Sequence, residues 1–269
     1  MTGALPSSRR QRQRQRQRHA YPYGVLSPLR RGSLICLICG GPIPSLDRMR
    51  RLFYAPAESP RPMTQKETNG SFPLAPLLAQ RRSGRAYDPE RPVARRQLLA
   101  LLEAARWAPS CYGDEPWRYL VFERDRERRD WEEAVACLSD GNRWAAQAPL
   151  LLLSVASGHF QRNGQPNRWA QHDTGAASEN LCLQAVELGL MAHQMGGFDP
   201  ERARRVFAIP ESFTPMAMIA VGYALPPARI PEELRERESA PRRRAPLAER
   251  CFAGRWGRPF AADGQEQER

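Results

Sequence analysis

Three arginines and a serine stand close together in the stretch RRSGRAYD, which spans residues 81–88. They are Arg81, Arg82, Ser83 and Arg85. A guanidinium binds phosphate oxygens through two parallel hydrogen bonds, and a serine hydroxyl adds a further donor. The spacing therefore indicates a site for a phosphate monoester, and a solvated run of charges is the alternative interpretation of these eight residues.

The elements that must position these arginines follow from the spacing of apolar residues. Leucines and alanines recur at helical spacing from residue 98 to residue 105, which predicts an amphipathic helix that ends before Pro109. The predicted strands span 117–124, 149–157 and 214–224, and further helices span 126–138, 173–192 and 200–207. Because helices and strands interleave without strict alternation, we expect an α+β domain whose helices cover a central sheet.

Most of the positive charge lies in the first quarter of the chain. The 269 residues carry a formal net charge of +12, and residues 1–62 hold twelve arginines against only Asp47 and Glu58. The run RQRQRQRQR at 10–18 has no apolar residue and is expected to be disordered. An arm that binds the phosphate backbone of nucleic acid is the alternative function, with steep salt dependence as its signature. We favour an extension without a function and do not expect nucleic acid as the partner.

A change of composition near Met63 divides the chain into two parts. We predict that 1–62 is a basic low-complexity extension and that 63–269 is one folded domain. The extension is expected to be disordered, or to result from a start of translation assigned upstream of the true start at Met49 or Met63.

Signals for export, metal binding and membrane insertion are weak. Arg30 and Arg31 precede a short apolar run, as in a twin-arginine export signal, but no cleavage-site pattern follows, so we expect a cytoplasmic protein. Cys36 and Cys39 form a C-x-x-C without a second ligand pair, so no metal is expected. No apolar run reaches the roughly 18 residues that a membrane-spanning helix needs. Rossmann, P-loop and hydrolase-triad motifs are also absent from the sequence.

Six segments carry a resemblance to a known family. In chain order they read RRSGRAYD (81–88), AARWAPSCYGDEPWRYLVF (104–122), HDTGAASENLCLQAVELGL (172–190), HQMGGFD (193–199), FAIPESFTPMAMIAVGY (207–223) and RRRAPL (242–247). In order and spacing this series resembles the FMN-dependent nitroreductase family of NAD(P)H-dependent flavin oxidoreductases. The resemblance runs from about residue 74 to residue 252, which is nearly all of the predicted folded part.

The resemblance implies a fold, an assembly and a reaction. The fold would be a nitroreductase-like three-layer α-β-α sandwich with a central mixed sheet, and the assembly a homodimer with FMN bound between the chains. NADH or NADPH would deliver hydride to the flavin, and a nitroaromatic, a quinone or a similar small acceptor would then take the electrons in a ping-pong mechanism. The anion bound by RRSGRAYD would be the FMN phosphate. A flavin-fragmenting, dehalogenating or azoline-oxidising member of the superfamily stays an alternative, with 157–171 and the tail beyond residue 248 as candidate specificity segments.

The resemblance also assigns flavin contacts by position. Two groups of residues would hold the phosphate and the pyrimidine side of the flavin, a loop of the partner chain would contact the isoalloxazine, and a glycine turn would lie beside flavin N5. The first group is Arg81, Arg82, Ser83 and Arg85, the second is Arg242 and Arg244, the loop residues are Pro109, Ser110 and Tyr112, and the turn is Gly196 and Gly197. No side chain is assigned as a general acid or nucleophile.

Two positions depart from the family pattern. Where relatives commonly read N-E-Q-P-W, residues 113–117 read GDEPW and lack both amide side chains. The change to Gly113 removes a hydrogen-bonding group near the flavin, and Glu115 adds a negative charge. We expect these changes to affect the flavin potential and the substrate while leaving flavin binding intact. Structural interpretations also exist, since Pro109 can simply end a helix and Gly196 with Gly197 can form a plain turn.

Overall fold

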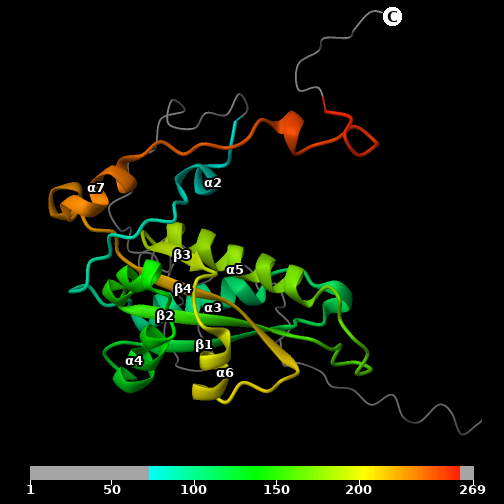
Figure 1. Cartoon of the computed structure of the whole chain (residues 1–269), viewed down its shortest axis with the longest axis horizontal. Helices are drawn as coiled ribbons and strands as arrows, with labels where there is room; N and C mark the ends of the chain where they lie inside the picture. The colour runs from blue at the N-terminus through cyan, green and yellow to red at the C-terminus, as the bar shows by residue number, and fades with distance from the viewer. Residues whose placement is uncertain (1–72, 261–269) are drawn as a thin grey trace, which may run out of the picture. The chain divides into compact units, whose positions relative to one another are not determined.

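The computed structural model describes residues 73–260 (Figure 1). Within them a four-stranded sheet has the order β1-β2-β4-β3. The strands are β1 (Trp117–Glu123), β2 (Leu150–Ser157), β3 (Met191–Met195) and β4 (Phe213–Gly222). The α-helices are α2 (Pro76–Gln80), α3 (Arg95–Arg106), α4 (Arg128–Ala136), α5 (Ala170–Glu187), α6 (Pro200–Val206) and α7 (Glu232–Ser239), and the 3-10 helices are η2 (Cys111–Gly113), η3 (Asp140–Gln147), η4 (Pro227–Arg229) and η5 (Leu247–Glu249). The basic extension 1–62, the C-x-x-C within it and the predicted boundary at 63 lie outside the described residues.

The two central strands, β2 and β4, have continuously apolar sequences, and their position in the sheet explains why. All eight residues of β2 are buried, because helices cover both faces of the sheet. Along β2 the side chains alternate between the two faces, so Leu151 and Leu153 join one apolar cluster while Leu150 and Leu152 join the other. Each fully buried leucine contributes about 1.5–3 kcal/mol through removal of apolar surface from water.

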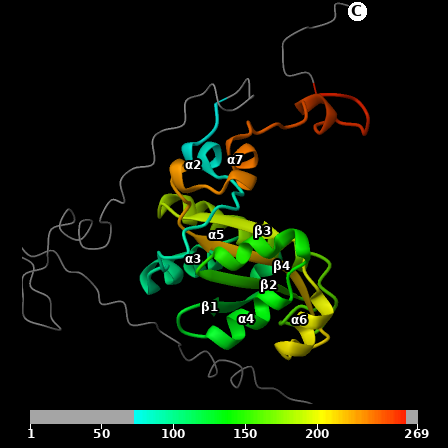
Figure 2. The ribbon, with the colours of Figure 1, turned by 60° about the vertical axis from the view of Figure 1, so that its left-hand side comes forward.

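Helices on both faces of the sheet give the domain within residues 73–260 three layers (Figures 1 and 2). On one face α3 and α5 pack against the sheet through Leu98, Leu101 and Leu181. On the other face α4 and α6 contribute Trp131 and Ala203 to the second cluster. The predicted α+β class, with helices around a central sheet, is confirmed.

The direction of the strands differs in one respect from the mixed sheet that was expected. All three strand pairs, β1 with β2, β2 with β4 and β4 with β3, are antiparallel within the described residues. The connections between these strands contain helices and are long enough for either direction. The residue pattern therefore could not fix the direction of any pair.

Strand β3 was missed by the sequence analysis, which extended a helix through residue 192. Helix α5 instead ends at Glu187, and Gly189 adopts a left-handed backbone with φ of 68°. Glycine pays little for that conformation, so it terminates the helix at low cost. The strand residues MAHQM contain no β-branched side chain, which removes the usual sequence signal for a strand.

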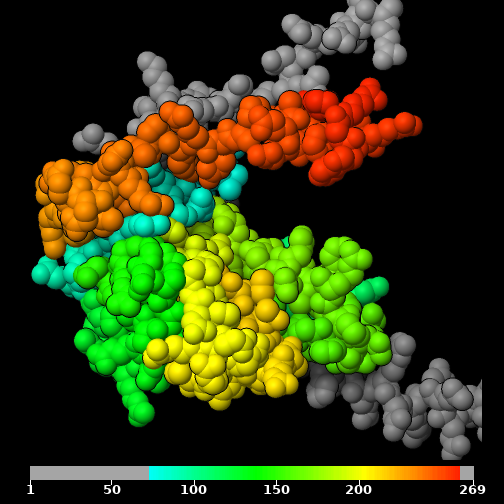
Figure 3. All heavy atoms as spheres, in the orientation of Figure 1, coloured from blue at the N-terminus to red at the C-terminus, as the bar shows by residue number. Residues whose placement is uncertain are grey.

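Helix α7, also not predicted, brings the C-terminal part of the described chain back to the RRSGRAYD stretch. The Glu238 carboxylate accepts the N–H of Arg85 at 2.5 Å, and Arg82 Nη2 donates to the carbonyl of Ala240 at 2.7 Å. Figure 3 shows the residues that follow α7, in orange, against the α2 segment in cyan. Residues about 160 positions apart in the chain therefore share one surface.

Candidate functional site

Four arginines from the two ends of the described chain converge and form what we call the arginine cluster. Its members are Arg81, Arg82, Arg242 and Arg244. Arg242 Nη1 donates to the carbonyl of Arg81 at 2.6 Å, and its Nη2 donates to the carbonyl of Ala79. Together with the bond from Arg82 to Ala240, these contacts fasten the 79–82 and 240–242 segments to each other.

The cluster holds more positive charge than its neighbours neutralise. Burial lowers the pKa of Arg242, and the nearby charges of Arg244, Arg81 and Arg82 lower it further. One carboxylate offsets this charge, because Arg81 Nε lies 3.4 Å from Glu179 of α5. A dianionic phosphate placed among the four guanidiniums would be stabilised by charge-assisted hydrogen bonds.

Arg85 does not join the arginine cluster, although the sequence groups it with Arg81 and Arg82. Its guanidinium carbon lies 5.3 Å from the ring centroid of Trp144 in η3. Burial lowers the pKa of Arg85, the charge of Arg237 lowers it further, and the charge of Glu238 opposes the shift. The Nε atom of Arg85 is buried without a hydrogen-bond partner among the described residues. An unspent donor of this kind suits a ligand oxygen.

A cavity of about 540 Å³ opens beside Arg85. The rings of Tyr87 and Trp144 stack within its wall, with centroids 6.1 Å apart and planes 6° apart. Gln147 adds a polar group, while Leu225 and Leu234 add apolar surface. The lining also includes Glu233 and Arg229, and Arg229 is paired with Asp88 and Glu90. The size lies within the range of small-molecule sites, and an aromatic wall beside a cationic donor suits a planar ligand.

His193 of β3 fixes the backbone between the arginine cluster and Arg85. Its Nδ1 donates to the carbonyl of Gly84 at 2.9 Å, and its ring lies against Trp144 with centroids 4.7 Å apart. Burial lowers the pKa of His193, the hydrogen bond to Gly84 raises it in part, and the charge of Arg85 lowers it. The imidazole is therefore held neutral near pH 7.

Acidification should destabilise the fold through His193. The folded state has a pKa below the ordinary value of 6.5, so the unfolded state takes up a proton first as the pH falls. The stabilisation from this histidine is fully present above the unfolded pKa of 6.5, and it is lost as the pH falls from there toward the lower pKa of the folded state. His193→Gln keeps an amide donor for Gly84 but does not titrate, so it should lose less stability between about pH 7.5 and about pH 5 in urea unfolding. Equal losses in both proteins would contradict this assignment.

The glycine turn follows β3 directly. The carbonyl of Gly197 accepts bonds from the Ser139 hydroxyl at 2.8 Å and from the Asn142 amide at 2.9 Å. A Cβ atom at Gly197 would lie 2.6 Å from that amide, so a side chain there would force a rearrangement. The N–H groups of Gly196 and Gly197 donate to no acceptor within residues 73–260. The turn therefore offers open backbone donors on a fixed frame.

The loop at 109–116 has an unusual backbone. Tyr112, Gly113 and Glu115 all adopt left-handed φ angles, of 57°, 65° and 48°. Each such non-glycine residue costs on the order of 1–3 kcal/mol, so its surroundings must fix it. The Ser110 hydroxyl does so by accepting the N–H of Glu115 at 3.0 Å.

None of the hydrogen bonds and ion pairs within residues 73–260 joins this loop to the arginine cluster of the same chain. The buried Asp173 of α5 accepts the N–H of Cys111 at 2.8 Å, and Glu179 of the same helix pairs with Arg81. Six residues separate the two carboxylates, which is about 9 Å along a helix. Pro109, Ser110 and Tyr112 therefore form a second group, whose use by a partner chain stays a prediction.

Seven residues that support the site were not assigned a role from the sequence. They are Asp114, Asn142, Trp144, Asp173, Glu179, His193 and Glu238. Asp114 was noted only as part of the divergent GDEPW stretch, yet its carboxylate is buried and bonded. A buried acid next to left-handed residues is a structural signal, and nothing in its immediate sequence gives that burial.

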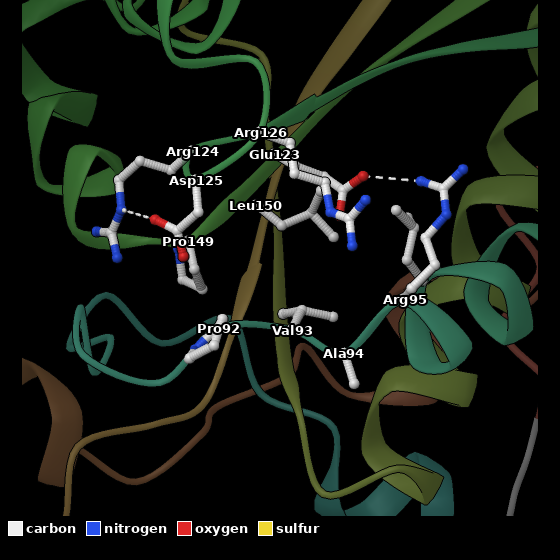
Figure 4. A pocket seen from close by; sticks show the side chains of 11 residues that line it. Pro92, Val93, Ala94, Arg95, Glu123, Arg124, Asp125, Arg126, Pro149 and Leu150 are labelled. Atoms are coloured by element: carbon white, nitrogen blue, oxygen red, sulfur yellow. Dashed lines mark hydrogen bonds and ion pairs between the residues drawn. The ribbon is translucent and has the colours of Figure 1, made fainter.

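A second cavity, of about 470 Å³, lies where α3 begins and β1 ends (Figure 4). Its charged groups are already paired: Arg95 lies 2.7 Å from Glu123, and Arg124 lies 3.6 Å from Asp125. None of the predicted site residues lines it. We therefore do not assign it a ligand.

The described part of the chain also lacks a metal cluster and a membrane-spanning helix. Residues 73–260 contain no group of three histidines, cysteines or acids placed to hold a metal ion. No helix among them combines the length and the apolar character needed to cross a membrane. The cysteines at 111, 137, 182 and 251 are free thiols.

Comparison with known proteins places the chain in a family. The model of the nitroreductase family matches residues 78–223, more than half of the chain. The NADH dehydrogenase of Thermus thermophilus is 30% identical over 189 residues, which cover 57% of this chain and 90% of that protein. An uncharacterized 15.4 kDa protein of Mycolicibacterium smegmatis is 40% identical over 124 residues, which cover 46% of this chain and 82% of that protein. A crystal structure described as an oxidoreductase containing FMN is 34% identical, with a TM-score of 0.67 over 73% of this chain and 99% of that one. The chain belongs to the nitroreductase family.

Proposed function

We propose that this chain is an FMN-dependent oxidoreductase that takes hydride from NADH or NADPH and reduces a small planar acceptor, such as a nitroaromatic or a quinone. The observation that carries the proposal is the arginine cluster, whose charge is largely unpaired. Similarity to a protein named NADH dehydrogenase and to a structure containing FMN supports the choice of donor and cofactor.

The described residues fit FMN at both of its ends. The arginine cluster would hold the phosphate, and the open N–H groups of Gly196 and Gly197 would approach the ring. The unspent Nε–H of Arg85 suits an oxygen on the pyrimidine side. When bound, FMN supplies a ring that accepts a hydride and passes electrons to a second substrate.

The protein's own part in the reaction is positioning and electrostatics. The positive charge of Arg85 would favour the negative charge that reduction places on the cofactor. His193 holds the Gly84 carbonyl, and Glu238 holds the N–H of Arg85, so that the motif keeps its shape before the ligand arrives. Such preorganisation reduces the free energy spent on ordering the site.

The absorption spectrum of the purified full chain tests the proposal. We expect a flavin spectrum, release of FMN on heating, and bleaching by NADH or NADPH in the absence of oxygen. A colourless protein that neither takes up added FMN nor oxidises either nucleotide would overturn it. Acceptor assays with nitroaromatic compounds and quinones would then separate the general reductase from the more specialised superfamily reactions.

We further propose that two chains form the complete site, with the loop at 109–116 serving the cofactor of the partner. Tyr112 and Trp107 are each 74% exposed, an unusual exposure for large aromatic side chains in one region of a single chain. The separation of the loop from the arginine cluster within one chain favours the same arrangement.

Mixing two variants that are each inactive at limiting FMN should restore activity if this assembly is correct. One variant carries Arg81→Ala with Arg244→Ala, and the other carries Tyr112→Ala. In a mixed dimer one site combines both defects, while the other combines an intact cluster with an intact loop. Random exchange of subunits should therefore recover about a quarter of the normal activity. No recovery, with mixed dimers demonstrated by mass spectrometry, would mean that each site is built from one chain.

A further inference from the structure

The segment 158–169, between β2 and α5, is tied to the loop at 109–116 by one buried side chain. The Asp114 carboxylate accepts the N–H of Gln161 at 2.8 Å and the Asn167 amide at 3.4 Å. The Asp114 carbonyl accepts the side-chain amide of Gln161 at 2.6 Å. Asp114 is 8% exposed, so these bonds compete little with water. The two segments therefore form one structural unit.

The tip of this segment is a tight turn of defined shape. Phe160 donates its N–H to the carbonyl of Gln165, and Gly164 donates to the carbonyl of Phe160, each at 2.8 Å. Gly164 has a φ of 68°, which the turn requires and glycine tolerates. Arg162 lies at this tip and is held there by the backbone of its neighbours.

Arg162 stacks on the aromatic residue of the adjoining loop. Its guanidinium carbon lies 4.1 Å from the ring centroid of Tyr112 and 5.5 Å from that of Phe160. The two rings meet edge to face at 5.9 Å. Stacking orients the guanidinium plane and leaves the N–H groups at its edge free to bind an anion.

Arg162 also lacks an acidic partner within residues 73–260, since none of the ion pairs there includes it. A neighbouring arginine behaves differently: Arg118 donates to the carbonyls of Glu115 and Trp117. Arg162 is thus a cation that the turn and the Tyr112 ring hold in place, and it makes no ion pair within the described residues.

We propose that Arg162 is a specificity-determining residue that binds an anionic group on one of the two redox substrates. The inference rests on the proposed function, because Tyr112 belongs to the loop expected beside the flavin. The anionic group is a carboxylate or sulfonate on the acceptor, or the additional phosphate that distinguishes NADPH from NADH. Asp114 acts as a positioning residue, since it sets where the Arg162 guanidinium stands.

Arg162→Ala in the full chain tests the inference, with Arg168→Ala as the matched control. Arg168 belongs to the same segment and stacks on Trp169 at 4.6 Å, not on Tyr112. The acceptors are 4-nitrobenzoate and the neutral 4-nitrobenzyl alcohol, and the donors are NADH and NADPH. Because ping-pong kinetics give kcat/KM separately for each substrate, the two sources of anion are distinguished.

If the anion is on the acceptor, we expect Arg162→Ala to lower kcat/KM for 4-nitrobenzoate about tenfold and to change kcat/KM for 4-nitrobenzyl alcohol by less than about twofold. If the anion is the additional phosphate of NADPH, we expect the same substitution to lower kcat/KM for NADPH about tenfold and to change kcat/KM for NADH by less than about twofold. Arg162→Glu should lower the same value further, because it replaces attraction by repulsion. Calorimetric titration of oxidised enzyme with 4-nitrobenzoate, or with NADP⁺ against NAD⁺, gives a readout that does not depend on turnover.

The role of Arg162 would be overturned if Arg162→Ala changed kcat/KM by less than about twofold for all four substrates. An equal effect of Arg168→Ala would do so as well, since it would indicate general electrostatic attraction to the surface. Failure of the proposed function looks different, because the unmodified chain would then bind no flavin and oxidise no nucleotide.

Discussion

FMN is expected to bind at least about 100-fold more weakly to the double variant Arg81→Ala, Arg244→Ala than to the unmodified chain, while riboflavin binds equally to both. Each lost charge-assisted hydrogen bond to the phosphate costs about 1.5–3 kcal/mol. Riboflavin has no phosphate, so its affinity should not depend on these side chains. Quenching of flavin fluorescence on titration gives both dissociation constants.

The matched control for this prediction is Arg205→Ala, which removes an exposed arginine from the last turn of α6, remote from the arginine cluster. Its FMN affinity should equal that of the unmodified chain. Rising salt should weaken FMN binding to the unmodified chain and have much less effect on the double variant. A parallel loss of riboflavin affinity would show that the double substitution disturbs the fold and not the phosphate site.

Leu152→Ala should lower the free energy of unfolding by about 2–5 kcal/mol. Leu152 is 0% exposed and lies opposite Ile219, where β2 and β4 form the centre of the sheet. The substitution leaves a cavity that the flanking strands and helices cannot close. The midpoint of denaturation in urea, with an unchanged slope, measures the loss.

Leu99→Ala is the control for the core substitution, because it removes the same atoms from a position that is 53% exposed on α3. Its effect should stay within about 0.5 kcal/mol. Comparable losses at Leu99 and Leu152 would mean that α3 is covered by a further surface, as in the proposed dimer.

The spacing of apolar residues predicted those helices and strands that are long or strongly apolar. The helix before Pro109 and the strands β1, β2 and β4 lie where their apolar patterns place them. Strand β3 and helix α7 have no such pattern: one lacks β-branched residues, and the other, EELRERES, has no buried residue. Their positions depend on tertiary contacts such as that between His193 and Gly84.

The resemblance allowed residues of the candidate site to be named from the sequence. It could not predict in which direction each side chain points. Arg81 and Arg85 are four positions apart, yet one turns toward Glu179 and the other toward Trp144. That choice is made by partners 59 to 98 positions further along the chain. The role of Asp114 was hidden for the same reason, since its partners lie in a segment that follows β2.

The interlocking of the 79–82 and 240–242 segments has a consequence for biosynthesis. The contacts that fasten them span 158 to 163 residues. A ribosome adds about 5–20 residues per second, so roughly ten to thirty seconds pass between synthesis of the first half of the arginine cluster and synthesis of the second. During this interval the nascent chain contains β1 and β2 but only half of the arginine cluster. If the arginine cluster binds the FMN phosphate as proposed, cofactor loading is a late event in maturation, and it discriminates completed chains from those that stalled before residue 240.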